Sequence, residues 1–178
     1  MIIDTHTHTF PDRIAARALA GMEKSIVDKH DWNVKIKVAG TRDALSESTK
    51  KNGVDISVVV PVATKPEQSA SINEFAAQTN EKTKETGVFS LGAIHPDNED
   101  YKDILDDIKK KGLKGIKVHP DYQKVEFDDP RYLRIFKYAD ELGLVIVTHA
   151  GEDIGLPEKI HCTPDMVLNV LNKVNPKK

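Results

Sequence analysis

The chain has 178 residues, and 39% of them are hydrophobic, which is enough to bury one sizeable core. Its 26 lysines and arginines nearly balance its 28 aspartates and glutamates, for a formal net charge of -2. This balance excludes the strongly basic surface that nucleic acids or acidic membranes require. We therefore expect a small-molecule substrate and no nucleic-acid or membrane partner. Assembly into a homo-oligomer is compatible with this composition.

The first ten residues, MIIDTHTHTF, contain neither a basic leader nor an apolar stretch of signal-peptide length. No apolar run elsewhere approaches the length of a membrane span. These features predict a cytoplasmic protein. Cys162 is the only cysteine, which excludes an internal disulfide and a cysteine-based metal cluster. Any metal would be held by nitrogen and oxygen ligands.

Short β-branched runs alternate with longer segments of helical period, a pattern typical of βα units around a parallel sheet. The strands that we predict cover residues 2–8, 56–62, 88–95, 115–119 and 144–149. Capping residues and glycines predict helices at 12–24, 41–52, 66–86, 100–111 and 130–142, and a last one from 163 onward. Residues 33–38 also alternate like a short strand.

A closed (β/α)8 barrel needs eight strands, and five cannot close. We predict a TIM-type (β/α) barrel of the metal-dependent hydrolase kind with only its first five βα units present. Residues 1–178 would then be a single domain, truncated at its C-terminus, with open apolar edges at its first and fifth strands. An open doubly wound sheet is the alternative fold. The positions of the histidines favour the barrel.

Five of the seven histidines fall at the end of a predicted strand: His6, His8, His95, His119 and His149. In a (β/α) barrel, this end of the strands forms the active-site face. His6 and His8 are two residues apart, so their side chains leave the same face of the strand and can converge on one ion. A hydrogen-bonded pair at a polar barrel end is the competing interpretation. We predict a metal site with His6, His8 and His149 as ligands.

Two further residues share the faces of these histidines. Asp4 lies one step deeper than His6 and could orient a ligating imidazole. Lys117 points the same way as His119, and a buried lysine is costly unless it is paired or used chemically. It could pair with a carboxylate such as Asp4, bind a substrate anion together with His119, or carry a carbamate that bridges two metals.

The remaining candidates are His95 and His161. His95 would lie on the substrate side or behind the ligands, and a hydrogen-bonded core histidine is nearly as good an interpretation. His161 follows the fifth strand in a loop from which it could reach the barrel mouth. No strand aims its side chain, so the simpler interpretation is that it takes no part.

Three motifs carry a resemblance to a known family: Asp4-Thr-His6-Thr-His8, Gly115-Ile-Lys-Val-His119-Pro and Thr148-His149-Ala-Gly151. In this order they resemble the amidohydrolase superfamily, in particular the amidohydrolase-2 branch that includes aminocarboxymuconate-semialdehyde decarboxylase. The resemblance implies a catalytic divalent ion, usually zinc, on His6, His8 and His149. It also implies a strand-six histidine and a strand-eight aspartate, which have no counterpart in these residues.

The chemistry that the resemblance implies is metal-assisted attack, in which the cation lowers the pKa of a bound water from 15.7 towards about 7. We therefore predict a hydrolase of an amide, lactone or ester of a small polar molecule, with His119 and Lys117 as catalytic residues. Non-oxidative decarboxylation is the alternative, since both side chains could hold a carboxylate. A non-catalytic or partner-completed fragment is a third hypothesis, because the base would come from strands that these residues lack.

Overall fold

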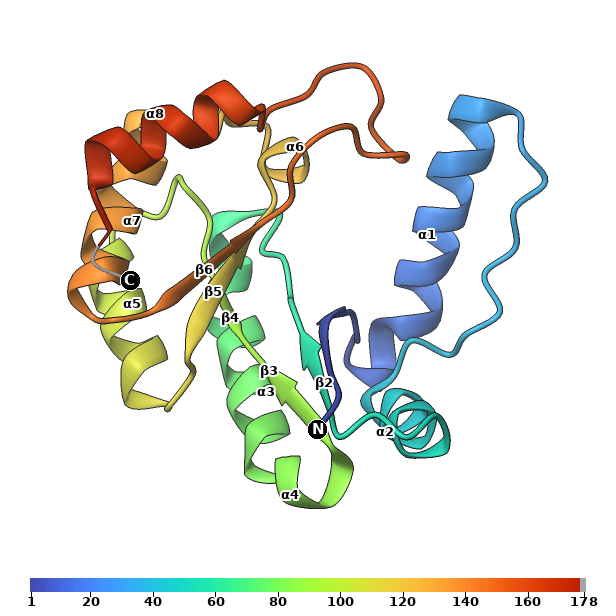
Figure 1. The fold of residues 1–178 in the computed structure, drawn as a ribbon. Helices are drawn as coiled ribbons and strands as arrows, with labels where there is room; N and C mark the ends of the chain where they lie inside the picture. The colour runs from blue at the N-terminus through green and yellow to red at the C-terminus, as the bar shows by residue number, and fades with distance from the viewer. Residues whose placement is uncertain (177–178) are drawn as a thin grey trace. The chain divides into compact units, whose positions relative to one another are not determined.

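The computed structural model describes residues 1–176. The chain forms two compact units, of which unit 1 comprises Met1–Val59 and Gln78–Ser90, and unit 2 comprises Val60–Ala77 and Leu91–Lys178. Each unit contains one three-stranded parallel sheet, ordered β1-β2-β3 in unit 1 and β4-β5-β6 in unit 2 (Figure 1). The predicted α/β class with parallel strands is confirmed.

Unit 1 is built around short strands whose polar residues are paired with a neighbouring helix. The hydroxyl groups of Thr49 and Ser57 lie 2.7 Å apart, and both residues are buried. Thr41 caps its helix as predicted, because its side chain accepts a hydrogen bond from the backbone of Ala44. The elements of unit 1 are β1 (Ile3–Thr7), α1 (Asp12–His30), α2 (Arg42–Lys51), β2 (Ile56–Val59), α4 (Thr83–Thr86) and β3 (Val88–Ser90).

Two segments of unit 1 differ from what their sequence pattern indicates. Helix α1 continues past residue 24 to His30, and it ends where Asp31 adopts a left-handed conformation and donates to the carbonyl of Val27. Residues 33–38 form no strand. The backbone N–H of Ile36 instead donates to the carboxylate of Glu23 in α1. The segment is therefore held against α1, and its alternating pattern does not reflect pairing with another strand.

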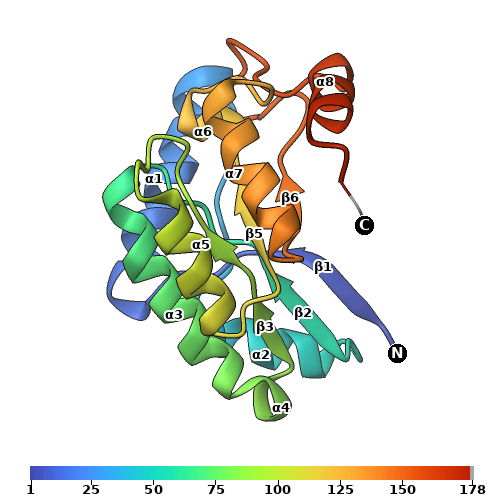
Figure 2. The same ribbon diagram turned by 90° about the vertical axis from the view of Figure 1, so that its left-hand side faces the viewer.

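Unit 2 has the larger hydrophobic core. Ile116 and Val118 are fully buried in it, while Lys117 between them points to the opposite face of the sheet. Helices α5 and α7 pack side by side, as Figure 2 shows. The elements are η1 (Pro66–Gln68), β4 (Gly92–Ala93), α5 (Tyr101–Lys110), β5 (Gly115–Val118), α6 (Pro120–Gln123), α7 (Pro130–Glu141), β6 (Val145–Thr148) and α8 (Pro164–Val174), and α3 (Ser69–Glu81) contributes residues to both units.

The predicted strand 88–95 and helix 66–86 are both interrupted. The strand is divided into β3 and β4 at Leu91, and the helix into η1, α3 and α4. Two asparagines of α3 each form hydrogen bonds with both the backbone N–H and the carbonyl of a strand residue. Asn73 does so with Ala93, and Asn80 does so with Ser90. These side chains occupy backbone groups that a longer strand would offer to a neighbour. The short helix α6 was not predicted.

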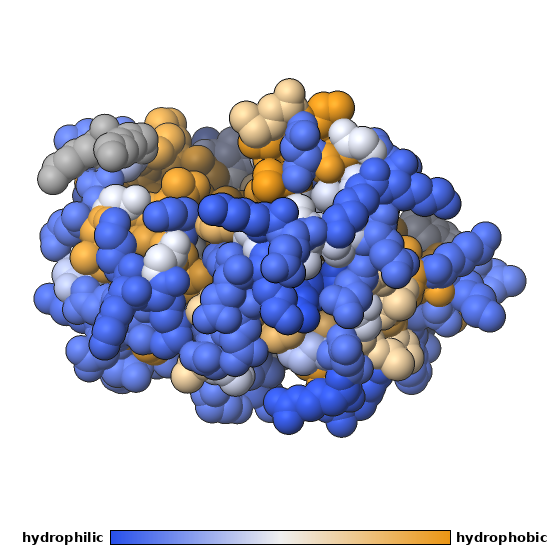
Figure 3. All heavy atoms as spheres, turned by 90° about the horizontal axis from the view of Figure 1, so that it is seen from below, coloured by the Kyte–Doolittle hydropathy of each residue, from blue (hydrophilic) through white to orange (hydrophobic). Residues whose placement is uncertain are grey.

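The predicted open edges are confirmed within residues 1–176, where β1 pairs only with β2 and β6 only with β5. Val145 in β6 is 58% exposed. A hollow of about 800 Å³ lies beside β6, and its lining includes Phe136 of α7 and Leu171 of α8. On the face that Figure 3 shows, hydrophilic residues dominate and hydrophobic residues gather in separate patches. None of the helices in the described part combines the length and apolar character that crossing a bilayer requires.

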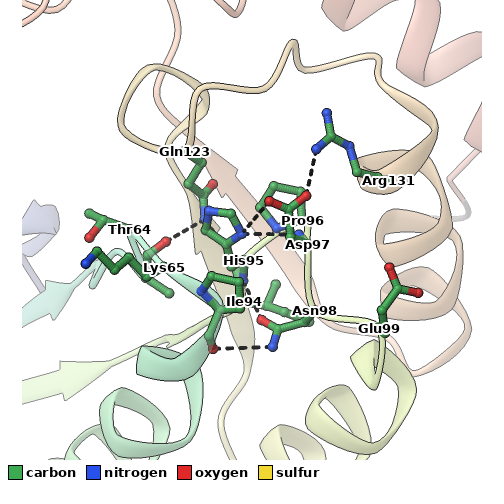
Figure 4. A network of polar contacts seen from close by, with 12 residues as sticks. Thr64, Lys65, Ile94, His95, Pro96, Asp97, Asn98, Glu99, Gln123 and Arg131 are labelled. Atoms are coloured by element: carbon green, nitrogen blue, oxygen red, sulfur yellow. Dashed lines mark hydrogen bonds and ion pairs between the residues drawn. The ribbon is translucent and has the colours of Figure 1, made fainter.

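The loop after β4 is held by a polar network around His95 (Figure 4). His95 is buried, and its Nδ1 accepts a hydrogen bond from the backbone of Asp97, 3.1 Å away. Its own backbone N–H donates to Asn98. Arg131 of α7 donates to the carboxylate of Asp97 at 2.6 Å. The network therefore fixes the loop to α7, and burial lowers the pKa of His95 below its usual value.

Two glycine substitutions should affect stability in opposite directions. A Cβ at Gly115 would collide with the backbone carbonyl of Val145 in β6, so Gly115→Ala should cost about 2 kcal/mol or more. Gly21 lies inside α1, and no atom lies within 4 Å of the place that a Cβ would take, so Gly21→Ala should stabilise the protein by up to about 1 kcal/mol. Urea unfolding measures both. Equal midpoints for the two variants would contradict the close approach of β5 and β6.

The lowered pKa of His95 makes stability depend on pH. The unfolded chain takes up a proton at His95 near the usual pKa of 6.5, whereas the folded chain does so only at lower pH. The free energy of unfolding should thus fall below about pH 6.5 by at most about 1.4 kcal/mol per pH unit from this group. His95→Asn keeps an acceptor near the Nδ1 position and should lose this dependence. Parallel stability curves between pH 7.5 and 5 for the two proteins would contradict this account.

Candidate metal centre and active site

Two histidines meet where β5 and β6 end. Val118 pairs with Thr148 in the parallel ladder, so His119 and His149 follow at neighbouring positions. The backbone N–H of His149 donates to the carbonyl of Val118 at 3.2 Å. The two imidazole rings stack with centroids 4.2 Å apart and an angle of 5° between their planes. The structure therefore brings together two of the three strand-end histidines of unit 2.

A third group, Asp153, completes this cluster, which we call the His–His–Asp cluster. Its Oδ2 lies 3.3 Å from Nε2 of His119 and 4.0 Å from Nε2 of His149. Its Oδ1 accepts a hydrogen bond from the backbone of Gly155 at 2.7 Å, which fixes the carboxylate. One ligand atom from each of the three residues lies within 4.8 Å of the others, close enough for one metal ion.

The hydrogen bonds of His119 indicate which of its nitrogens carries the proton. Its Nδ1 accepts from the backbone N–H of Tyr122 at 3.4 Å, and the Tyr122 ring stacks on the imidazole. A neutral imidazole that accepts at Nδ1 has its hydrogen on Nε2. This hydrogen points towards Asp153. His119 is thus suited to hold Asp153, and less suited than His149 to bind a metal.

His149 has the free nitrogen that a metal would need. Its Nε2 is buried and has no hydrogen-bond partner in residues 1–176. A buried nitrogen of this kind costs free energy unless a ligand satisfies it. Nε2 of His149 and the nearby carboxylate of Asp153 provide one nitrogen and one oxygen donor, and such donors suit divalent metal ions. The described residues therefore fit a divalent ion.

Lys117 lies on the same strand as His119 and is fully buried. Its Nζ has no hydrogen-bond partner in the described part of the chain. Within unit 2 the structure therefore gives Lys117 no carboxylate partner, and pairing with Asp4, which belongs to unit 1, stays a prediction. Burial lowers the pKa of Lys117 to about 8, since the charged form loses its hydration. The ammonium group thus has no hydrogen-bond partner in the described residues, on the strand that leads to His119.

His161 is held by an aspartate that the sequence analysis did not single out. Nδ1 of His161 lies 2.9 Å from Oδ1 of Asp121, and the same oxygen accepts the backbone N–H of His161 at 3.0 Å. Asp121 is 2% exposed, and its Oδ2 has no hydrogen-bond partner among residues 1–176. His161 is therefore held in a fixed orientation although no strand aims it, and its part in the site stays a prediction.

The opening motif lies in unit 1. The rings of His6 and His8 have centroids 5.0 Å apart, so the two side chains do leave the same side of the chain. Asp4 accepts a hydrogen bond from the backbone N–H of His6 at 3.2 Å. His95 belongs to the network of Figure 4 in unit 2, where its contacts are those of a hydrogen-bonded core histidine. Ligation by His6 and His8 stays a prediction.

Asp153 and Asp121 are the residues that sequence reasoning missed. Asp153 lies four residues after His149 in a loop, directly behind another acidic residue, Glu152. Nothing in the sequence indicates which of these two neighbouring acidic residues faces the histidines, because a loop has no regular period that would assign its side chains to a face. Asp121 follows the strand-end sequence His119-Pro120, which was the one available signal for it.

Comparison with solved structures shows a shared fold. A 5-carboxyvanillate decarboxylase from Sphingomonas paucimobilis has a TM-score of 0.60 and 16% identity, over 89% of this chain and 57% of that chain. A manganese complex of 5-carboxyvanillate decarboxylase from Novosphingobium aromaticivorans has a TM-score of 0.62 and 14% identity, over 100% of this chain and 55% of that one. A probable 2-pyrone-4,6-dicarboxylic acid hydrolase from Acinetobacter baumannii has a TM-score of 0.55 and 12% identity, over 98% and 54%.

This chain thus spans little more than half the length of these solved chains. No curated protein sequence matches it significantly. A family model described as amidohydrolase matches residues 3–171, which is nearly the whole chain. The chain therefore belongs to the amidohydrolase-2 family, the branch of the metal-dependent amidohydrolase superfamily that its three motifs resemble.

Proposed function

We propose that this chain contributes to the active site of a metal-dependent, non-oxidative decarboxylase of a small aromatic carboxylate. The observation that carries the proposal is the buried ammonium group of Lys117, which has no hydrogen-bond partner in the described residues and lies on β5 two residues before His119 of the cluster. A substrate carboxylate would provide the missing negative charge. Two of the solved relatives are named as decarboxylases of an aromatic acid, which supports this choice of substrate class.

The fold that we propose for the active protein is a TIM-type (β/α) barrel, to which residues 1–178 contribute five βα units of a single domain. The parallel strands of both units and the fold similarity to little more than half of each solved chain support it. The unpaired edges of β1 and β6 are where further strands would add. In such a barrel the carboxyl ends of the strands form the active-site face.

The ligands that we propose are His6, His8 and His149, and Asp153 is a further oxygen donor beside His149. Zinc remains our choice of ion from the family resemblance, and manganese is the ion in one solved relative. A divalent ion held there would draw electron density from the substrate oxygens. His119 would orient Asp153, Lys117 would bind the carboxylate, and Asp4 would support the opening histidines. We propose a cytoplasmic protein that acts on a small molecule.

Hydrolysis is the second candidate, because one solved relative is named as a probable hydrolase of a pyrone dicarboxylic acid. The contact of His119 with Asp153 at 3.3 Å would allow the pair to move a proton from water. The assay below distinguishes the two reactions, because only decarboxylation releases carbon dioxide. A non-catalytic or partner-completed chain would release none.

Metal binding can be tested without a substrate. The purified chain, loaded with zinc or with manganese and then dialysed, should retain about one equivalent by elemental analysis. His149→Ala should lower the affinity at least about tenfold, and His6→Ala with His8→Ala should abolish stoichiometric binding. His30→Ala, at a histidine outside the proposed ligand set, is the matched control. Stoichiometric metal in the His6/His8 double variant would exclude these two residues as ligands.

Lys117→Met separates catalysis from stability. It removes a buried charge whose pKa is lowered to about 8, so the folded protein should become more stable by on the order of 2–3 kcal/mol at pH 7. Release of carbon dioxide from 5-carboxyvanillate by the metal-loaded protein should nevertheless fall at least about a hundredfold, because the substrate carboxylate loses its partner. A variant that is both stabilised and fully active would overturn the role of Lys117.

A further inference from the structure

The pair formed by Asp121 and His161 has the geometry of a carboxylate that orients an imidazole. An ionised carboxylate can only accept hydrogen bonds, so the ring nitrogen that faces it, Nδ1, carries the proton. This contact is 2.9 Å long, and the backbone N–H of His161 adds a second bond of 3.0 Å to the same oxygen. The ring is therefore fixed in one tautomer, with the lone pair on Nε2.

The backbone around the pair is held on both sides. In helix α6, Gln123 accepts the backbone N–H of His119 and donates to the carbonyls of Ala63 and Ile94, at 2.8 Å each. On the other side, the carbonyl of His161 accepts the backbone N–H of Phe127 at 2.8 Å. Neither partner can move far without breaking these bonds, so the orientation of the imidazole is preorganised.

Short stretches of backbone connect the pair to the His–His–Asp cluster. Asp121 is two residues after His119, where β5 has ended. The residue after His161, Cys162, accepts the backbone N–H of Gly151 at 3.0 Å, and Gly151 is two residues after His149. Both members of the pair are thus connected by short backbone paths to the two histidines at the ends of β5 and β6.

The other imidazoles of unit 2 near this point already have defined contacts. Nε2 of His119 faces Asp153 at 3.3 Å, and the buried Nε2 of His149 is the nitrogen best placed for a metal. In contrast, Nε2 of His161 makes no hydrogen bond to residues 1–176, and its side chain keeps 16% of its surface exposed. It is the imidazole nitrogen of this group that can exchange protons with water.

We propose that His161 is the proton-transfer residue of this site and that Asp121 is its positioning residue, an inference that rests on the proposed decarboxylase function. His161, protonated at both nitrogens, gives its Nε2 proton to the ring carbon that bears the carboxylate. The carbon–carbon bond to the carboxylate breaks, carbon dioxide leaves, and the bonding electron pair restores the aromatic ring. Throughout, the Nδ1 proton stays on His161 and is donated in a hydrogen bond to Asp121. Nε2 of His161 is then protonated again by water.

The decisive variant is His161→Asn, whose amide N–H can still reach Asp121 although it lacks Nε2. With 5-carboxyvanillate, we expect kcat for carbon dioxide release to fall at least about a hundredfold, with KM and bound metal changed less than about threefold. The exchange of ring hydrogen for deuterium in vanillate, which needs proton transfer alone, should be lost in parallel. Asp121→Asn should reduce both rates less, and His30→Asn, at a histidine to which we assign no role, should leave both unchanged.

Nitrogen-15 NMR of His161 in the metal-free protein tests the pair without any turnover. We expect the Nδ1–H tautomer, and a mixture of tautomers in Asp121→Asn. An Nε2–H tautomer in the wild type overturns the proposal, and so does loss of bound metal in His161→Asn, because His161 would then be a ligand. An active wild type whose rates His161→Asn leaves unchanged overturns the role of His161 alone. A metal-loaded wild type that neither releases carbon dioxide nor exchanges vanillate contradicts the decarboxylase function, and this role with it.

Discussion

The parallel pairing of β5 with β6 is the constraint on which the site in unit 2 depends. Gly115 pairs with Val145 and Val118 with Thr148, without a break in register. The lack of a side chain at Gly115 allows the two backbones to approach at the start of the ladder. Both strands therefore end at the same level, and this stacks His119 on His149. A shift by one residue would turn one of the two side chains to the other face.

The same register buries the charged side chain of Lys117, which is unfavourable for folding. Ile116 and Val118 point into the hydrophobic core, so Lys117 must point to the other face. Buried there without a partner in residues 1–176, it lowers the stability of the protein. Groups with strongly shifted pKa values are concentrated at functional sites, and a buried lysine without a hydrogen-bond partner, two residues before His119, fits that rule.

Sequence reasoning succeeded where periodicity determines the structure. The β-branched runs predicted the strands of both sheets, and the histidines that follow β5 and β6 were identified because they end such runs. It failed where the local structure is determined by a contact with a residue that is distant in the sequence. Asn73 binds the backbone of Ala93, Glu23 binds the backbone of Ile36, and neither contact leaves a local pattern. Asp121 and Asp153 lie outside the strands, so no spacing rule distinguished them from the other acidic residues.

Imidazole side chains at the ends of the strands are proposed to bind a divalent ion, and the rest of the chemistry depends on that ion. X-ray absorption at the zinc edge of the zinc-loaded chain tests this most directly, since imidazole rings give a multiple-scattering pattern that oxygen ligands lack. We expect nitrogen and oxygen neighbours at about 2.0–2.1 Å with the pattern of two or more imidazoles. A shell of oxygen atoms without that pattern would contradict the proposed metal site.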